Sequence, residues 1–98
     1  DLCVAIGSSV NSQHAKAEAA DFEVLGVDNA EVADWVKMNC ETDQLILEFY
    51  TPGEPNSGWI HASYVQFQPR AQYLRAYRDK ETRKTKYLPI TGKAVDLT

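Results

Sequence analysis

Two histidines and one aspartate are the side chains of this chain best suited to metal chemistry. His61 lies in the middle of an alternating, β-rich stretch, residues 57–68, where a histidine needs an explanation. His14 ends a polar segment, and Asp21 follows it in a stretch of mostly small and apolar residues. A catalytic zinc takes three nitrogen or oxygen ligands from the protein and keeps a fourth position open for water. We therefore predict that His14, Asp21 and His61 bind Zn2+.

Spacing alone leaves ordinary structural roles open for the same residues. A histidine in a strand is often a core residue bonded to a backbone group, and an aspartate at a strand end is often a surface charge. A histidine and an aspartate at the spacing of His14 and Asp21 also occur together by chance in many proteins. The candidate site therefore depends on the elements that position it.

A fourth residue, Glu48, is predicted to lie across from His61. The stretches Gln44–Tyr50 and Trp59–Val65 are both β-rich and flank the turn-forming loop 51–58, so they predict an antiparallel hairpin. If their ends pair across this loop, Glu48 lies directly opposite His61, with Cβ atoms about 4.5–5.5 Å apart. The face towards the core would then carry Leu45, Leu47, Phe49, Ile60, Ala62 and Tyr64. The other face would carry Ile46, Glu48, Trp59, His61 and Ser63.

The remaining elements predict an α+β fold. Apolar residues recur at helical spacing in residues 30–39, with Asp28 or Asn29 as the N-cap, and a strand is expected around 19–25. A second hairpin is expected over 72–90. We therefore expect a small antiparallel sheet packed against one or two helices.

Length and composition bound the function further. The chain has 98 residues, 44% of them hydrophobic, which predicts a single domain over 1–90 followed by a loosely held tail, 91–98. No segment approaches the roughly 18 apolar residues of a membrane span. The net charge of −4 does not favour nucleic acid as a partner, and we expect a monomer.

Two features leave alternatives open. The basic stretch 70–86 could bind an anionic polymer. The favoured interpretation is a solvated hairpin edge whose charges discourage pairing with a strand of another chain. Cys3 and Cys40 do not form a metal-binding C-x-x-C pair, and the sequence does not decide whether they form a disulfide.

Three ordered segments resemble a known peptidase family. They read S-x-H-x-x-x-x-A-x-D-F at 12–22, D-Q-L-I-L-E-F at 43–49 and G-W-I-H-A-S-Y at 58–64. In this order they resemble the zinc D-Ala-D-Ala carboxypeptidases, a metallopeptidase family that includes phage endolysins and shares its fold with the Hedgehog signalling domain. The similarity spans about residues 7–65 and is most like the subgroup of phages and bacteria.

The resemblance implies a function and roles for several residues. His14, Asp21 and His61 match the zinc ligands of the family. The implied substrate is a peptidoglycan stem peptide, cut in the manner of a D-Ala-D-Ala carboxypeptidase or an endolysin, so the protein would act on the cell wall as a periplasmic, extracellular or phage-encoded enzyme. Residues that would orient this peptide are Ser12, Gln13 and Trp59.

The chain departs from the family pattern in two ways. Relatives commonly carry the acid/base group three residues before the last histidine, where this chain has Gly58. We predict that Glu48 takes this role, with Glu54 as the alternative. Members also carry an N-terminal helix and an arginine-bearing segment before the first motif, so we expect an N-terminally truncated or unusually short version.

Two other classes of function remain open at this point. The chain could be a zinc-binding but non-catalytic module of the same fold, serving in cell-wall binding or in a virion. It could also be a small interaction domain that binds no metal. Zinc content separates the last class from the others, and turnover of a muropeptide separates the enzyme from the non-catalytic module.

Overall fold

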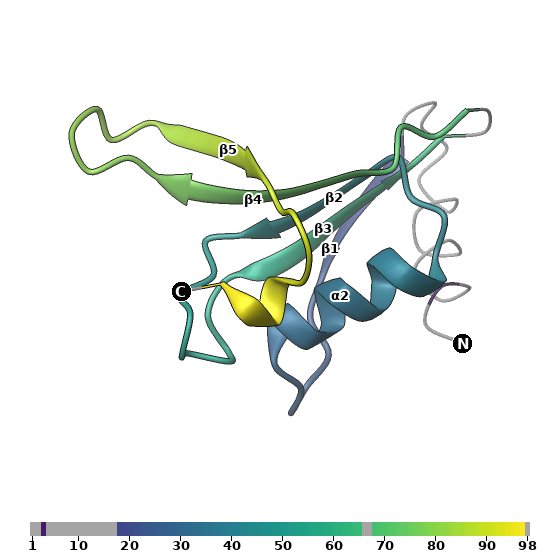
Figure 1. The fold of residues 1–98 in the computed structure, drawn as a ribbon, viewed down its shortest axis with the longest axis horizontal. Coiled ribbons are helices and arrows are strands. Elements are labelled where there is room, and N and C mark those ends of the chain that lie inside the picture. The colour runs from purple at the N-terminus through teal and green to yellow at the C-terminus, as the bar shows by residue number, and fades with distance from the viewer. Residues whose placement is uncertain (1–2, 4–17, 66–67, 98) are drawn as a thin grey trace.

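A five-stranded sheet with one helix beneath it forms the fold (Figure 1). The computed structural model describes Cys3, residues 18–65 and residues 68–97. Residues 18–65 and 68–97 contain the helix α2 (Asn29–Asn39) and the short 3-10 helix η1 (Ala94–Asp96). The strands are β1 (Glu18–Phe22), β2 (Gln44–Glu48), β3 (Trp59–Tyr64), β4 (Gln72–Arg78) and β5 (Thr85–Pro89), in the spatial order β1-β3-β2-β4-β5.

The predicted α+β class and both predicted hairpins are confirmed. The β1–β3, β2–β3 and β4–β5 pairs are antiparallel, whereas β2 and β4 run parallel, which differs from the wholly antiparallel sheet that we expected. The reason is the connection after β3. Ser63, near the end of β3, pairs with Gln44 at the start of β2, and the chain then crosses β2 to begin β4 beside the same Gln44.

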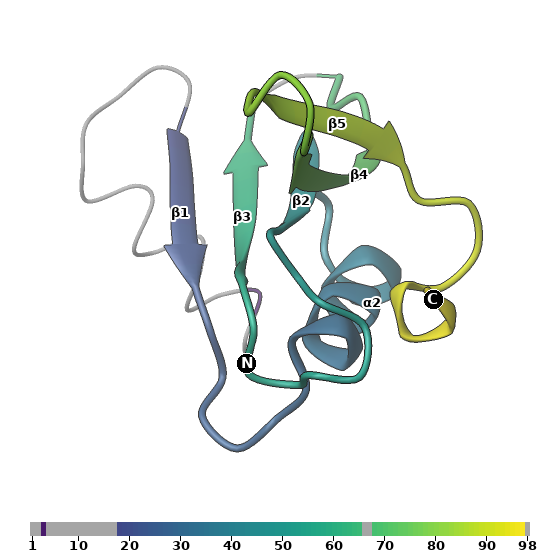
Figure 2. The ribbon, with the colours of Figure 1, turned by 90° about the vertical axis from the view of Figure 1, so that its left-hand side faces the viewer.

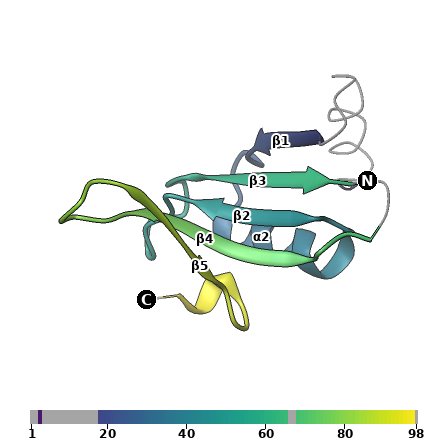
Figure 3. The same ribbon diagram turned by 90° about the horizontal axis from the view of Figure 1, so that it is seen from above.

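Helix α2 covers one face of the sheet, as the view from above shows (Figure 3). It begins after Asp28, whose Oδ1 accepts a hydrogen bond from the backbone N of Ala30 at 2.8 Å, so the predicted N-cap is confirmed. Neither helix of the described residues is long and apolar enough to cross a membrane. The core between α2 and the sheet is made of Ala30, Val32, Ala33, Val36, Leu45, Leu47, Ile60, Ala62, Tyr73, Ile90 and Ala94.

The C-terminal residues are held more closely than we expected. Ala94 is 1% exposed and packs in the core, with η1 lying beside α2 (Figure 2). Asp34 of α2 accepts hydrogen bonds from the backbone N of Ala94 at 2.6 Å and of Val95 at 3.1 Å, and from the hydroxyl of Tyr73 at 2.8 Å. This carboxylate thus satisfies backbone N–H groups at the start of η1 that have no helical partner.

A disulfide joins Cys3 to Cys40, which follows the last residue of α2. The bond answers the question that the sequence left open. It closes a segment containing β1 and α2, and such a closure stabilises a fold mainly by restricting the unfolded chain.

Candidate metal centre

Strands β1 and β3 bring Asp21 and His61 together. Their register places the two residues directly opposite each other, so both side chains emerge on the face of the sheet that α2 does not cover. Oδ1 of Asp21 accepts a hydrogen bond from Nδ1 of His61 at 2.6 Å. The side chain of His61 is 29% exposed and that of Asp21 is 61% exposed, so the pair is accessible from solvent.

Glu48, the last residue of β2, joins this pair from the other side of β3. The predicted pairing of Glu48 with His61 is wrong by two positions: Glu48 pairs with Trp59, and Ile46 pairs with His61. A shift of two keeps the side chains of β2 and β3 on their predicted faces, so Glu48 remains a diagonal neighbour of His61. One ligand atom from each of Asp21, Glu48 and His61 lies within 4.8 Å of the other two.

Phe49 explains why the hairpin is shifted. Its φ of 55° ends the extended backbone of β2 one residue after Glu48, so the loop is longer than we predicted. Phe49 was expected on the core face, but its ring packs against Trp59 with 5.4 Å between the ring centroids. Tyr50 contacts the core instead. Burial and a hydrogen bond from its hydroxyl to Asp28 raise the pKa of Tyr50 to about 12.

The other predicted core positions of this hairpin are confirmed. Those at the centre are fully buried, and the last lies partly buried against the same core. They are Leu45, Leu47, Ile60, Ala62 and Tyr64.

Gly58 packs against the backbone at the end of β2. Its φ is +67°, and a Cβ at this position would overlap the carbonyl oxygen of Glu48 and lie 2.8 Å from the carbonyl carbon of Phe49. No side chain fits there without moving the backbone. The position that commonly carries the acid/base group in relatives therefore cannot carry one in this hairpin, whereas the carboxylate of Glu48 lies close to His61.

A family model described as Peptidase M15 matches residues 2–63. The chain belongs to this family. The match confirms the zinc peptidase family that the three motifs predicted, and it covers Asp21, Glu48 and His61. No curated protein and no solved structure matches the chain.

The donor atoms of the cluster suit the zinc on which M15 peptidases depend. An imidazole nitrogen and carboxylate oxygens are ordinary zinc ligands, and Asp21 and His61 supply one of each. Backbone pairing of β1 with β3 holds these two side chains next to each other, and both are accessible from solvent. The third predicted ligand, His14, lies outside the described residues.

The remaining predicted site residues of this M15 domain fall into three groups. Trp59 begins β3 beside the cluster. Glu54 lies in an exposed turn of the loop, where its carbonyl oxygen accepts hydrogen bonds from the backbone N of Ser57 at 3.0 Å and from its hydroxyl at 2.6 Å. Ser12 and Gln13 lie outside the described residues.

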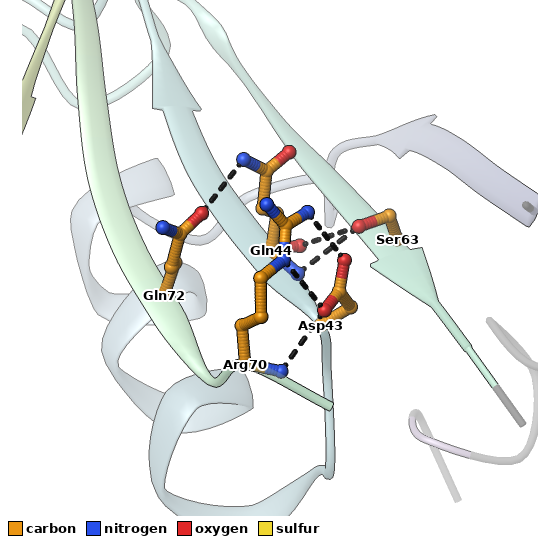
Figure 4. A network of polar contacts seen from close by, with 5 residues as sticks. All are labelled: Asp43, Gln44, Ser63, Arg70 and Gln72. Carbon is orange, nitrogen blue, oxygen red and sulfur yellow. Dashed lines mark hydrogen bonds and ion pairs between the residues drawn. The ribbon is translucent and has the colours of Figure 1, made fainter. Parts of the chain in front are cut away.

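A polar network anchors the other end of β2 (Figure 4). Both carboxylate oxygens of Asp43 accept hydrogen bonds from the guanidinium of Arg70, at 3.0 and 2.7 Å, and these bonds lower the pKa of Asp43 to about 2. The backbone N of Gln44 donates to the hydroxyl of Ser63 at 3.0 Å, and its side-chain amide donates to Gln72 at 2.8 Å. The network thus ties the start of β2 to β3 and β4, the strands on either side of it.

A hollow of about 310 Å3 adjoins the cluster on the side of β1. It is lined by Asp21, Phe22, Glu23 and Trp59. Glu23 was not among the site residues predicted from the sequence. The available signal was its alternation with Asp21 in the strand predicted around 19–25, since residues two apart in a strand share a face.

Proposed function

We propose that this M15 domain is a zinc-dependent peptidase that cleaves peptidoglycan stem peptides, as a D-Ala-D-Ala carboxypeptidase or an endolysin does. The observation that carries the proposal is the cluster of Asp21, Glu48 and His61 on an open face of the sheet. These residues come from three strands and supply both metal ligands and a further carboxylate. Membership of the peptidase family gives the reaction class.

Zinc would be held by Asp21 and His61, with His14 as the third ligand. When bound there, zinc would polarise a carbonyl group and would lower the pKa of a water molecule from about 15.7 toward 7. Asp21 and His61 are cross-strand neighbours, so backbone pairing orients both donors before the metal arrives. This arrangement is supported by the cluster itself, in which one ligand atom from each of Asp21, Glu48 and His61 lies within 4.8 Å of the other two.

Glu48 is the proposed general base and acid. Its carboxylate would take the proton from the attacking water and return it to the leaving amine. Two observations support Glu48 over Glu54: Glu48 belongs to the cluster with His61, and Glu54 lies in an exposed turn of the loop. The close packing of Gly58 on the backbone of Glu48 would hold the base in position.

The substrate would lie across the open face beside the cluster. Trp59 lines the adjoining hollow and is held by its contact with Phe49, so it can orient a peptide, with Ser12 and Gln13 as further wall residues. That the peptide contains a D-amino acid is an inference from the family resemblance. A bacterial cell-wall peptide is therefore the first substrate to test.

The test combines metal content with turnover. Elemental analysis should find about one zinc per wild-type chain and much less in His61→Ala. The zinc-loaded wild type should release fragments from purified muropeptides, and Glu48→Gln should keep its zinc but lose turnover by about 10²–10⁴-fold. Glu41→Gln, a change at an exposed residue before β2, is the matched control.

Each contrary outcome has a distinct meaning. A folded wild type that takes up no zinc would overturn the metal centre. Zinc binding without turnover of any muropeptide would indicate the non-catalytic zinc module instead. If Glu54→Gln lost turnover while Glu48→Gln stayed active, the role of general base would belong to Glu54.

A further inference from the structure

The hollow beside the cluster has two walls of different chemistry. One wall is the carboxylate of Glu23, just after β1, and the other is the indole of Trp59 at the start of β3. Asp21 closes the end towards the metal centre. From Glu23 a second hollow of about 400 Å3 continues over Val24, Leu25, Gly26 and Asn56. An extended chain therefore has room to pass from the metal centre along Glu23.

One buried amide holds both walls in position. The side chain of Asn29 is 1% exposed, and its Nδ2 donates to Oε1 of Glu23 at 3.1 Å. The same nitrogen lies 3.0 Å from the carbonyl oxygen of Ser57 and 3.2 Å from that of Gly58, directly before Trp59. The bonds of Asn29 thus fix the carboxylate of Glu23 and the backbone before Trp59, while the ring of Phe49 packs against the indole. Both walls are therefore ordered before a ligand arrives, and the entropic cost of binding is lower.

The charge around the hollow is negative. Between residues 18 and 65 the only lysine or arginine is Lys37, while aspartates and glutamates recur throughout the stretch. Lys37 donates to the carbonyl oxygen of Ala71, at the start of β4 and away from β1. A carboxylate beside an aromatic ring is a setting that attracts an ammonium or guanidinium group.

The spacing along the chain relates the hollow to the scissile bond. Asp21 and Glu23 are two residues apart, a separation of at most about 6.8 Å along the chain. An extended peptide repeats its side chains on one face at the same distance. A group bound at Glu23 would therefore belong to a residue close to the bond held at the metal centre.

We propose that this hollow is a subsite for a positively charged side chain of the substrate peptide, with Glu23 as the residue that selects it and Trp59 as its apolar wall. The inference rests on the proposed peptidase function, because it assigns the substrate of the same site. Glu23 would act on binding and not on the chemical step, since it lies outside the cluster of Asp21, Glu48 and His61.

The test uses matched peptides that end in D-Ala-D-Ala and carry either lysine or Nε-acetyl-lysine near the scissile bond. Binding is measured by calorimetry on zinc-loaded Glu48→Gln, in which the proposed base is absent and the peptide stays intact. We expect the lysine peptide to bind about five- to tenfold more tightly. Adding Glu23→Gln should remove this preference, and adding Glu41→Gln should keep it.

Turnover by the wild type gives the second readout. The preference for lysine should appear mainly in KM, and it should weaken at high salt because the contact is partly exposed. Equal binding of the two peptides, or a preference that survives Glu23→Gln, would overturn the subsite. Failure to cleave either peptide would count against the peptidase function, while the calorimetry would still decide whether the hollow selects a cation.

Discussion

The ion pair of Asp43 with Arg70 allows a quantitative prediction of the free energy of unfolding. Asp43→Asn keeps the shape of the side chain and removes its charge. The pKa of Asp43 is about 2 in the folded chain, against an ordinary value of 3.8, a difference worth about 2.5 kcal/mol. Because the Arg70 side chain is 57% exposed, solvent screens the pair, and we expect a loss of about 1.5 kcal/mol.

The effect should depend on pH in a defined direction. The pKa of Asp43 is lower in the folded chain than in the unfolded chain, so the carboxylate stabilises the fold fully at pH values above about 4. This contribution is lost as the pH falls from 3.8 through about 2, because the proton then neutralises Asp43 in both states. The difference in stability between the wild type and Asp43→Asn should therefore shrink across this window.

The assay is urea unfolding of both proteins at several pH values, with thermal melting at pH 7. A loss of about 1.5 kcal/mol predicts a melting temperature lower by about 6–12 °C for a domain of this size. The control is Asp79→Asn, which removes the ion pair with Lys86 in the β4–β5 hairpin. The carboxylate of Asp79 is more exposed than that of Asp43, so this change should alter the midpoint less. A constant difference between wild type and Asp43→Asn from pH 7 to pH 2 would refute the electrostatic account.

Three further predictions concern stability. Gly58→Ala should cost about 2–3 kcal/mol in urea unfolding, because the new Cβ meets backbone at a positive φ; an unchanged midpoint would contradict this packing. Breaking the Cys3–Cys40 disulfide with a reductant should lower stability by about 3–4 kcal/mol, since it closes a loop of 37 positions, and the reductant should not affect Cys40→Ser. Tyr73→Phe should cost about 1 kcal/mol through the lost hydrogen bond to Asp34, as measured by thermal melting, and no change would show that this bond is energetically neutral.

The candidate site was predictable in its members but not in its geometry. The alternation of β2 and β3 assigned Glu48 and His61 to the same face, and the structure keeps them there. Their register depended on Phe49, because a single residue at positive φ changed the length of the loop. A positive φ at a phenylalanine cannot be predicted from the local sequence, since glycine is the residue that usually adopts it.

In the fold as well, the elements that depend on nearby residues were predictable, and the contacts between distant segments were not. The helix over residues 29–39 with its Asp28 cap and the second hairpin follow from periodicity and turn residues near each element. The parallel pairing of β2 with β4 does not, because it depends on how the chain crosses β2 after β3. The docking of Ala94 on α2 likewise depends on Asp34, sixty positions earlier in the chain.

The sequence by itself determined the element types, the α+β class, the peptidase family and the choice of Asp21, Glu48 and His61 as candidates. The element types and the fold class follow from residue type and periodicity within short segments, and the family follows from the resemblance of three ordered motifs to known peptidases. Only the tertiary structure decided that Asp21 pairs with His61 across β1 and β3, that Glu48 is a diagonal neighbour, and that Glu23 lines the adjoining hollow. The reason is physical: strand pairing joins residues forty positions apart through backbone hydrogen bonds, whose carbonyl acceptor every residue type has and whose N–H donor only proline lacks.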